Sequence, residues 1–126
     1  MMPKRSMVKI VNRTTGETLL ESVRWCSSYL CKFRGLQFHH QPHPGEGIVL
    51  VHEKDTVSTS SIHMFFVFFS IAAVWINNQG VVTSAQLAKP FRPFYASPQP
   101  ARYVLETTPG FLKRISVGDE LEFVDM

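Results

Sequence analysis

The chain has 126 residues, the length of one domain, and carries 13 Lys and Arg against 10 Asp and Glu, for a formal net charge of +3. Hydrophobic residues make up 44% and charged residues 18%, values that are typical of a globular protein and argue against disorder. A cationic surplus this small does not indicate a nucleic-acid binder, because phosphate-binding proteins concentrate many cations on one face. We therefore expect one globular domain over residues 1–126.

The beginning of the chain and its cysteines indicate the compartment. The first 16 residues contain cations but no apolar stretch long enough for a secretory signal, so we expect a cytoplasmic protein. The two cysteines, Cys26 and Cys31, are interpreted as packing or surface residues. On one helix their spacing would point the thiols about 140° apart. We therefore predict no disulfide between them, and the pair alone is not a metal motif.

The N-terminal third predicts two strands, a short helix and loops. The strands are expected over residues 7–12 and 17–23, and Ser27 or Ser28 can cap a helix that ends at Gly35. The remaining elements before the central apolar run are a loop rich in Pro, Gly and His over 38–47, a short apolar strand over 48–52 and a polar surface loop over 53–61.

The run from Ile62 to Ile76 is the most apolar part of the chain, because only His63 and Ser70 interrupt it. As a helix its fifteen residues would span only about 22 Å, short of the roughly 30 Å hydrocarbon core of a membrane. Its Phe, Val, Ile and Trp residues favour strands, but one strand of this length would be unusual. We predict two core strands, over 62–68 and 71–76, the second joined by a turn at 77–80 to a partner strand over 81–87.

The C-terminal part predicts a proline-stiffened loop and two further strands. Residues 89–100 contain four prolines and cannot form a helix. Thr108 and Pro109 predict the start of a short helix. Strands are expected before and after it, over 103–107 and 120–124.

Several segments together resemble a known prokaryotic family. They are Arg34-Gly35-Leu36, Ile62-His63, Phe65-Phe66, Val74, the Asn-Gly turn into Val81-Val82, Lys89-Pro90-Phe91-Arg92, Val104-Leu105-Glu106, Gly110 and Gly118-Asp119. In this order they resemble domain of unknown function 192, also called uncharacterised protein family 0127, over about residues 23–123. The resemblance implies a compact, mostly β fold with one or two short helices and no established activity.

The chain departs from that family at a position that could carry chemistry. Family members typically have an aspartate where this chain has Ala72. A carboxylate in an apolar strand would be a functional candidate, since burial raises its pKa and it needs a partner. If the family uses that carboxylate, this chain is expected to lack the activity.

Two histidine features are candidates for sites. His39, His40 and His43 could hold a metal such as zinc, but their spacing fits no established zinc signature, so we interpret them as part of a polar loop and predict no metal or cofactor. His63 could be a buried acid or base, or a neutral histidine that is hydrogen-bonded at the start of a strand.

Charged residues near the apolar strands give a second set of candidates. Arg34 could bind an anionic ligand, or it could cap carbonyl groups and pair with a carboxylate. Glu106 lies in an apolar strand, where a carboxylate needs a cationic partner, and we expect that partner to be Arg34 or Arg92.

The loop over residues 89–100 interleaves cations with aromatic residues, namely Lys89, Phe91, Arg92 and Phe94 among others. It could engage a ligand or partner at low entropic cost, or it could cover one end of the sheet with its aromatic side chains turned inward.

These observations predict an α+β domain with a small, mostly antiparallel, strongly bent β-sheet or partly closed barrel and one or two short helices. The function hypothesis is a non-catalytic binding or accessory module for a protein or small ligand, with no transmembrane segment. The alternative is a small hydrolase-like enzyme that uses His63 with Arg34 or Glu106 in a cleft, and a third hypothesis is self-association through exposed Phe residues.

Overall fold

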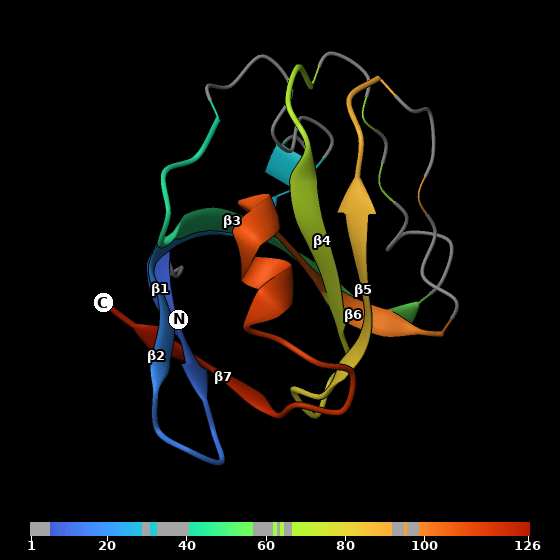
Figure 1. Ribbon diagram of the computed structural model, residues 1–126. Coiled ribbons are helices and arrows are strands. Elements are labelled where there is room, and N and C mark those ends of the chain that lie inside the picture. The colour runs from blue at the N-terminus through green and yellow to red at the C-terminus, as the bar shows by residue number, and fades with distance from the viewer. Residues whose placement is uncertain are drawn as a thin grey trace.

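The computed structural model describes residues 6–28, 31–32, 41–56, 62, 64, 67–91, 95 and 99–126. Strands and one short 3-10 helix form most of this part of the chain (Figure 1). The elements are β1 (Met7–Asn12), β2 (Thr18–Cys26), β3 (Glu46–Thr56), β4 (Ile71–Ile76), β5 (Val82–Ala88), β6 (Ala101–Thr107), the 3-10 helix η1 (Pro109–Lys113) and β7 (Leu121–Asp125).

The described strands form one sheet with the order β5-β4-β6-β3-β2-β1-β7. Neighbouring strands are antiparallel except β2 and β3, which run parallel, so the sheet is mixed. It is curved but open rather than closed into a barrel (Figure 1). The expectation of a mostly antiparallel, bent sheet is confirmed. The α+β class overstated the helix content, because the described residues are predominantly strand.

The sheet buries apolar side chains on both faces. Successive side chains of a strand point to opposite faces, and a layer of apolar residues packs on each face. On β4, Ala72, Val74 and Ile76 face one layer, while Ala73 and Trp75 face the other. The first layer contains Phe111 of η1, and we call it the helix-side layer. The second is called the loop-side layer, because Ile62, Met64, Val67 and Tyr95 pack there. This two-sided burial explains why the sequence of β4 is apolar throughout.

The apolar run does not form two strands. Its second half is β4, with the bounds that the sequence predicts. In its first half, Ile62 makes an isolated bridge with Tyr95, while Met64 and Val67 are buried without belonging to a strand. The strand predicted over 62–68 is therefore wrong for the residues that are described. Apolar side chains can be buried by packing onto a sheet face without joining its hydrogen-bond ladder.

The turn between β4 and β5 follows the predicted chemistry. The side chain of Asn77 accepts hydrogen bonds from the backbone amides of Gln79 (3.0 Å) and Val81 (3.0 Å). Gly80 has φ +85°, a conformation that glycine adopts without a Cβ clash. Here a Cβ would also lie 2.5 Å from both the Arg13 guanidinium and the carbonyl oxygen of Leu121. The turn is therefore specified both locally and by a distant side chain.

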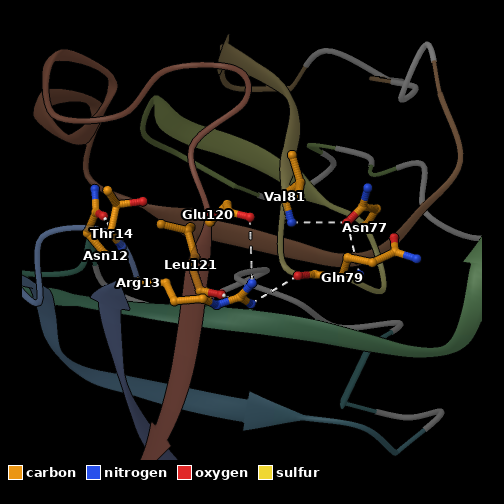
Figure 2. A network of polar contacts seen from close by, with 8 residues as sticks. All are labelled: Asn12, Arg13, Thr14, Asn77, Gln79, Val81, Glu120 and Leu121. Carbon is orange, nitrogen blue, oxygen red and sulfur yellow. Dashed lines mark hydrogen bonds and ion pairs between the residues drawn. The ribbon is translucent and has the colours of Figure 1, made fainter.

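The two ends of the sheet order meet at one corner, where Val81 and Glu120 form an isolated antiparallel bridge. Figure 2 shows Arg13, from the β1–β2 turn, reaching this corner. Its guanidinium donates to the backbone carbonyls of Gln79 (2.9 Å) and Leu121 (3.0 Å) and lies 3.9 Å from the Glu120 carboxylate. We call these contacts the Arg13 network. It joins three turns or strands that are far apart in the sequence.

The predicted absence of a disulfide is wrong, because Cys26 and Cys31 are bonded, with their Cα atoms 5.7 Å apart. The prediction assumed that both residues lie on one helix. Instead Cys26 is the last residue of β2, and Cys31 lies in a helical turn. The backbone amide of Cys31 donates to the Ser28 hydroxyl (3.2 Å). The change from strand to helix brings the two side chains together.

Within the described part of the chain, no helix has both the length and the apolar composition needed to cross a membrane.

Candidate functional site

Two aromatic rings lie exposed at the surface of the loop-side layer. Phe68 is 59% exposed and Phe91 is 54% exposed, and their rings pack edge to face with centroids 5.2 Å apart. Lys89, which is also exposed, lies two residues before Phe91. We call Phe68, Lys89 and Phe91 the Phe68–Phe91 patch. Exposed aromatic pairs of this kind can bind an apolar surface, and a lysine beside them favours an acidic partner.

The backbone around the patch is fixed by hydrogen bonds to buried residues. The amide of Phe91 donates to the carbonyl of Met64 (3.0 Å), and the amide of Lys89 donates to the Tyr95 hydroxyl (2.7 Å). Tyr95 and Ile62 exchange two backbone hydrogen bonds of 2.8 Å. Phe91 itself has φ +62°, in the left-handed region that a bulky side chain rarely adopts. The patch is therefore built on an anchored loop, and its geometry is set by the core beneath it.

Glu106 lies in the middle of the sheet and is 4% exposed. Its neighbours in the strand register are Ile48 of β3 and Ala73 of β4, which belong to the loop-side layer. Burial raises its pKa to about 8, because the charged form loses its hydration. A neutral carboxyl group at pH 7 could donate a hydrogen bond or a proton.

His52 of β3 is a second buried titratable group, which was not among the candidates predicted from the sequence. It is 9% exposed, and its Nε2 atom is buried with no hydrogen-bond partner in the described part of the chain. Burial, with a smaller contribution from the Lys32 ammonium, lowers the pKa of His52 to about 4. This histidine is therefore neutral at pH 7. Its position at the end of an apolar stretch was the sequence signal that could have identified it as a buried group.

The structure describes only part of the predicted site. Lys89 and Phe91 contribute to one exposed surface, and Glu106 is buried in the sheet. The other predicted site residues, Arg34, His63, Arg92 and Phe94, lie outside the described residues, as do His39 and His40. The pairing of Glu106 with Arg34 or Arg92 and the alternative enzyme hypothesis therefore remain predictions.

The remaining loop histidine, His43, is exposed, and its amide donates to the Glu46 carboxylate (2.9 Å). In the part of the chain that is described, no three His, Cys, Asp or Glu residues are grouped to hold a metal ion. Ala72 is fully buried in the helix-side layer and lies opposite Thr107 in the sheet. The family aspartate would therefore point to the face opposite to that of Glu106.

Phe68 is the patch residue that was expected in a core strand, over residues 62–68. Apolar character alone predicts burial, and it cannot distinguish the inward side chains of Met64 and Val67 from the outward side chain of Phe68. The available signal was the break in the run at Ser70, which Phe68 and Phe69 directly precede. Where the chain leaves the core at such a break, the side chains on one side of it become exposed to solvent.

The family model DUF192, described as "Uncharacterized ACR", matches residues 10–123. The chain belongs to this family. The match begins earlier than the predicted limit of about residue 23 and therefore includes the second half of β1. The family description gives no activity, so membership establishes the relationship and no reaction.

Curated relatives of this DUF192 protein come from archaea. A UPF0127 protein from Pyrococcus furiosus is 29% identical over 116 residues, which cover 90% of this chain and 97% of the relative. A UPF0127 protein from Thermococcus sibiricus is 28% identical over 116 residues, covering 90% of this chain and 73% of the relative. These relatives are also named only as members of an uncharacterised family.

Solved structures share the fold of this DUF192 protein. One from Sinorhizobium meliloti 1021, whose description proposes a transcription regulator, has a TM-score of 0.81 at 23% identity and covers 98% of this chain and 96% of its own. Another, a protein of unknown function from Novosphingobium aromaticivorans, has a TM-score of 0.78 at 17% identity and covers 92% and 83%. At these identities the likeness shows the fold alone.

Proposed function

We propose that this DUF192 protein is a non-catalytic binding module and that the Phe68–Phe91 patch is its contact surface for a partner protein. Two aromatic rings that are more than half exposed support this proposal. Burying an aromatic ring stabilises a protein by about 1.5–3 kcal/mol, so leaving two of them in water forgoes a substantial gain. That gain becomes available when a partner covers the patch.

The observation that carries the proposal is the backbone of Phe91. A non-glycine residue at φ +62° costs on the order of 1–2 kcal/mol relative to ordinary backbone. The hydrogen bond to Met64 and the anchoring through Tyr95 offset this cost. The strained backbone conformation nevertheless places the Phe91 side chain in solvent rather than in the core. Strain that places an apolar ring in solvent has no use in folding, and it preorganises the ring for a partner.

The chemistry of the patch indicates the kind of partner. Aromatic side chains contribute most to protein interfaces when they insert into apolar pockets. Lys89 beside them is exposed and favours an acidic group at the edge of the contact. We therefore propose a partner that presents an apolar pocket bordered by Asp or Glu.

Photo-cross-linking with benzoyl-phenylalanine at position 91, in the organism that makes the protein, tests this proposal. The captured partner is then purified, and its affinity is measured for the wild type, Phe68→Ala and Phe91→Ala. We expect each substitution to weaken binding by about tenfold or more, as is usual for a central aromatic contact. Circular dichroism and the melting temperature confirm that the variants are folded.

Val117 provides the matched control, because it is an exposed apolar residue in the turn after η1, with 66% exposure. Val117→Ala should leave the affinity unchanged, and the cross-linker at position 117 should not capture the same partner. Equal loss for Val117→Ala and Phe91→Ala would contradict the proposal. So would cross-links only to second copies of the chain, which would indicate self-association.

A further inference from the structure

A pocket of about 370 Å³ lies on the other side of the molecule, between the segment before β3 and η1. Its apolar walls are Leu20 of β2, Phe111 of η1 and the loop prolines Pro42 and Pro44. Leu20 and Phe111 also belong to the helix-side layer, so the floor of the pocket is the core itself. A volume near the lower end of the range for ligand sites suits a small molecule.

Among the described residues that line the pocket, three have polar side chains: Gln41, Thr108 and Arg114. Thr108 immediately precedes η1, and its side chain makes no capping hydrogen bond to that helix. Its hydroxyl group is therefore available as a donor or acceptor toward the pocket. Few polar groups on apolar walls are the arrangement that orients a ligand of mixed character.

Arg114 supplies the charge of the pocket. One terminal nitrogen donates to the carbonyl of Leu19 (2.9 Å), which fixes the guanidinium in place, and the other lies 3.4 Å from the Glu17 carboxylate. Both side chains of that ion pair are about half exposed or more, so the pair is weak. A guanidinium has five N–H groups, and these contacts use two of them. A ligand carboxylate can therefore bind beside Glu17 or replace it.

We propose that this pocket binds an apolar carboxylate, with its hydrocarbon part against Leu20 and Phe111 and its carboxylate on Arg114. This site lies on the opposite face of the sheet from the loop-side layer, and it does not depend on the Phe68–Phe91 patch. The proposed chemistry has two possible sources, a free carboxylic acid or the C-terminal residue of a peptide. Both present the same groups to the pocket.

Titration of the full chain with 3-phenylpropionate, followed by NMR or calorimetry, tests the proposal. We expect a dissociation constant on the order of 0.1–1 mM, as for a small fragment with one charged contact. The neutral amide of the same acid should bind about tenfold more weakly or worse, because it cannot make charge-assisted hydrogen bonds. Equal binding of acid and amide, or no binding of either, would overturn the proposal.

Gly110 lines the pocket, and a larger side chain at this position should reduce the volume of the pocket. A Cβ at this position meets no atom within 4 Å, and its backbone is not in the left-handed region. Gly110→Leu should therefore fill the pocket, abolish binding and leave the melting temperature unchanged or raised. Unchanged affinity in a folded Gly110→Leu protein would place the ligand elsewhere and contradict the proposal.

The role of the charge is tested on neighbouring residues of the same segment. Arg114→Gln should weaken binding of 3-phenylpropionate by about tenfold, and Arg114→Lys by less, since it keeps the charge but not the planar fork. Lys113→Gln is the matched control, because Lys113 is an exposed cation that does not line the pocket, and it should leave the affinity unchanged. An equal loss of affinity in Lys113→Gln and Arg114→Gln would show that only the net positive charge matters, and it would contradict the proposed site.

A peptide arm identifies the source of the carboxylate. A tripeptide that ends in a free C-terminal Phe is compared with its C-terminal amide, under the same conditions. Tighter binding of the free peptide than of 3-phenylpropionate assigns the pocket to protein C-termini, and the reverse order assigns it to small acids. Either result supports binding of an apolar carboxylate in this pocket, provided that Gly110→Leu abolishes the binding.

Discussion

At the scale of single residues, Glu106 and His52 are titratable groups that the fold keeps away from water. Their pKa values move in opposite directions for the same reason, because burial disfavours the charged form of each. For Glu106 the folded state holds its proton up to about pH 8, whereas the unfolded chain releases it near pH 4.5. Folding above pH 4.5 therefore requires proton uptake, and the free energy of unfolding falls as the pH rises toward 8.

Glu106→Gln should remove this dependence. We expect the stability of the variant relative to the wild type to rise between pH 5 and pH 8, by roughly 1 kcal/mol for each pH unit. Urea unfolding at pH 5, 6.5 and 8 measures the difference. The comparison with the wild type is needed because His52 acts in the opposite sense, losing stability as the pH falls from 6.5 toward 4. Glu122→Gln, at an exposed position of β7, is the control, and a flat difference for Glu106→Gln would contradict the prediction.

At the scale of elements, the disulfide determines how β2 continues into the helical turn that follows it. Cys26 is buried at the end of the strand, and Cys31 packs against the loop-side layer. The bond closes a loop of only six residues, so the entropy that it removes from the unfolded chain is modest. The bond adds a covalent link between the end of β2 and the helical turn at Cys31.

Cys31→Ser should lower the free energy of unfolding by about 2 kcal/mol, the value expected for closing so short a loop. Guanidinium unfolding with and without dithiothreitol measures this. The reductant should shift the midpoint of the wild type toward that of the variant and leave the variant unaffected. A wild-type midpoint that does not respond to the reductant, with both thiols alkylated under native conditions, would show that the bond is absent.

At the scale of the whole molecule, the local patterns predicted the strands better than their arrangement. The bounds of β1 and β4 and the Asn77–Gly80 turn follow from apolar composition and turn chemistry, which act within a few residues. The parallel pairing of β2 with β3 and the bridge between Val81 and Glu120 join distant segments. No short-range pattern encodes such contacts.

The candidate site was predictable to a similar extent. The interleaved aromatic and cationic residues of the loop indicated Lys89 and Phe91, and an acidic residue in an apolar strand indicated Glu106. The exposure of Phe68 and the pocket beside Arg114 could not be predicted, because each depends on which segments meet in space. Side-chain type was therefore readable from the sequence, but the neighbours of each side chain were not.

The Arg13 network is the contact by which the β1–β2 turn joins the corner where β5 and β7 meet. Arg13→Ala removes two charge-assisted hydrogen bonds to the carbonyls of Gln79 and Leu121, and we expect a loss of about 1–3 kcal/mol. We expect the loss of protection from hydrogen exchange to be confined to this corner. The amide of Leu121 reports it, because this amide donates to the carbonyl of Gly80 there (2.8 Å).

Native-state exchange measured by NMR would therefore show faster exchange at Val82 and Leu121 in Arg13→Ala, with β3 and β6 unchanged. Arg24→Ala, at an exposed position of β2, controls for the loss of one arginine. Arg13→Lys should restore part of the protection, since one ammonium can reach only some of the acceptors that the guanidinium spans. Uniform acceleration across all strands would show that Arg13 supports the whole fold rather than this corner, and no change at Leu121 would show that the backbone bridge holds the corner without it.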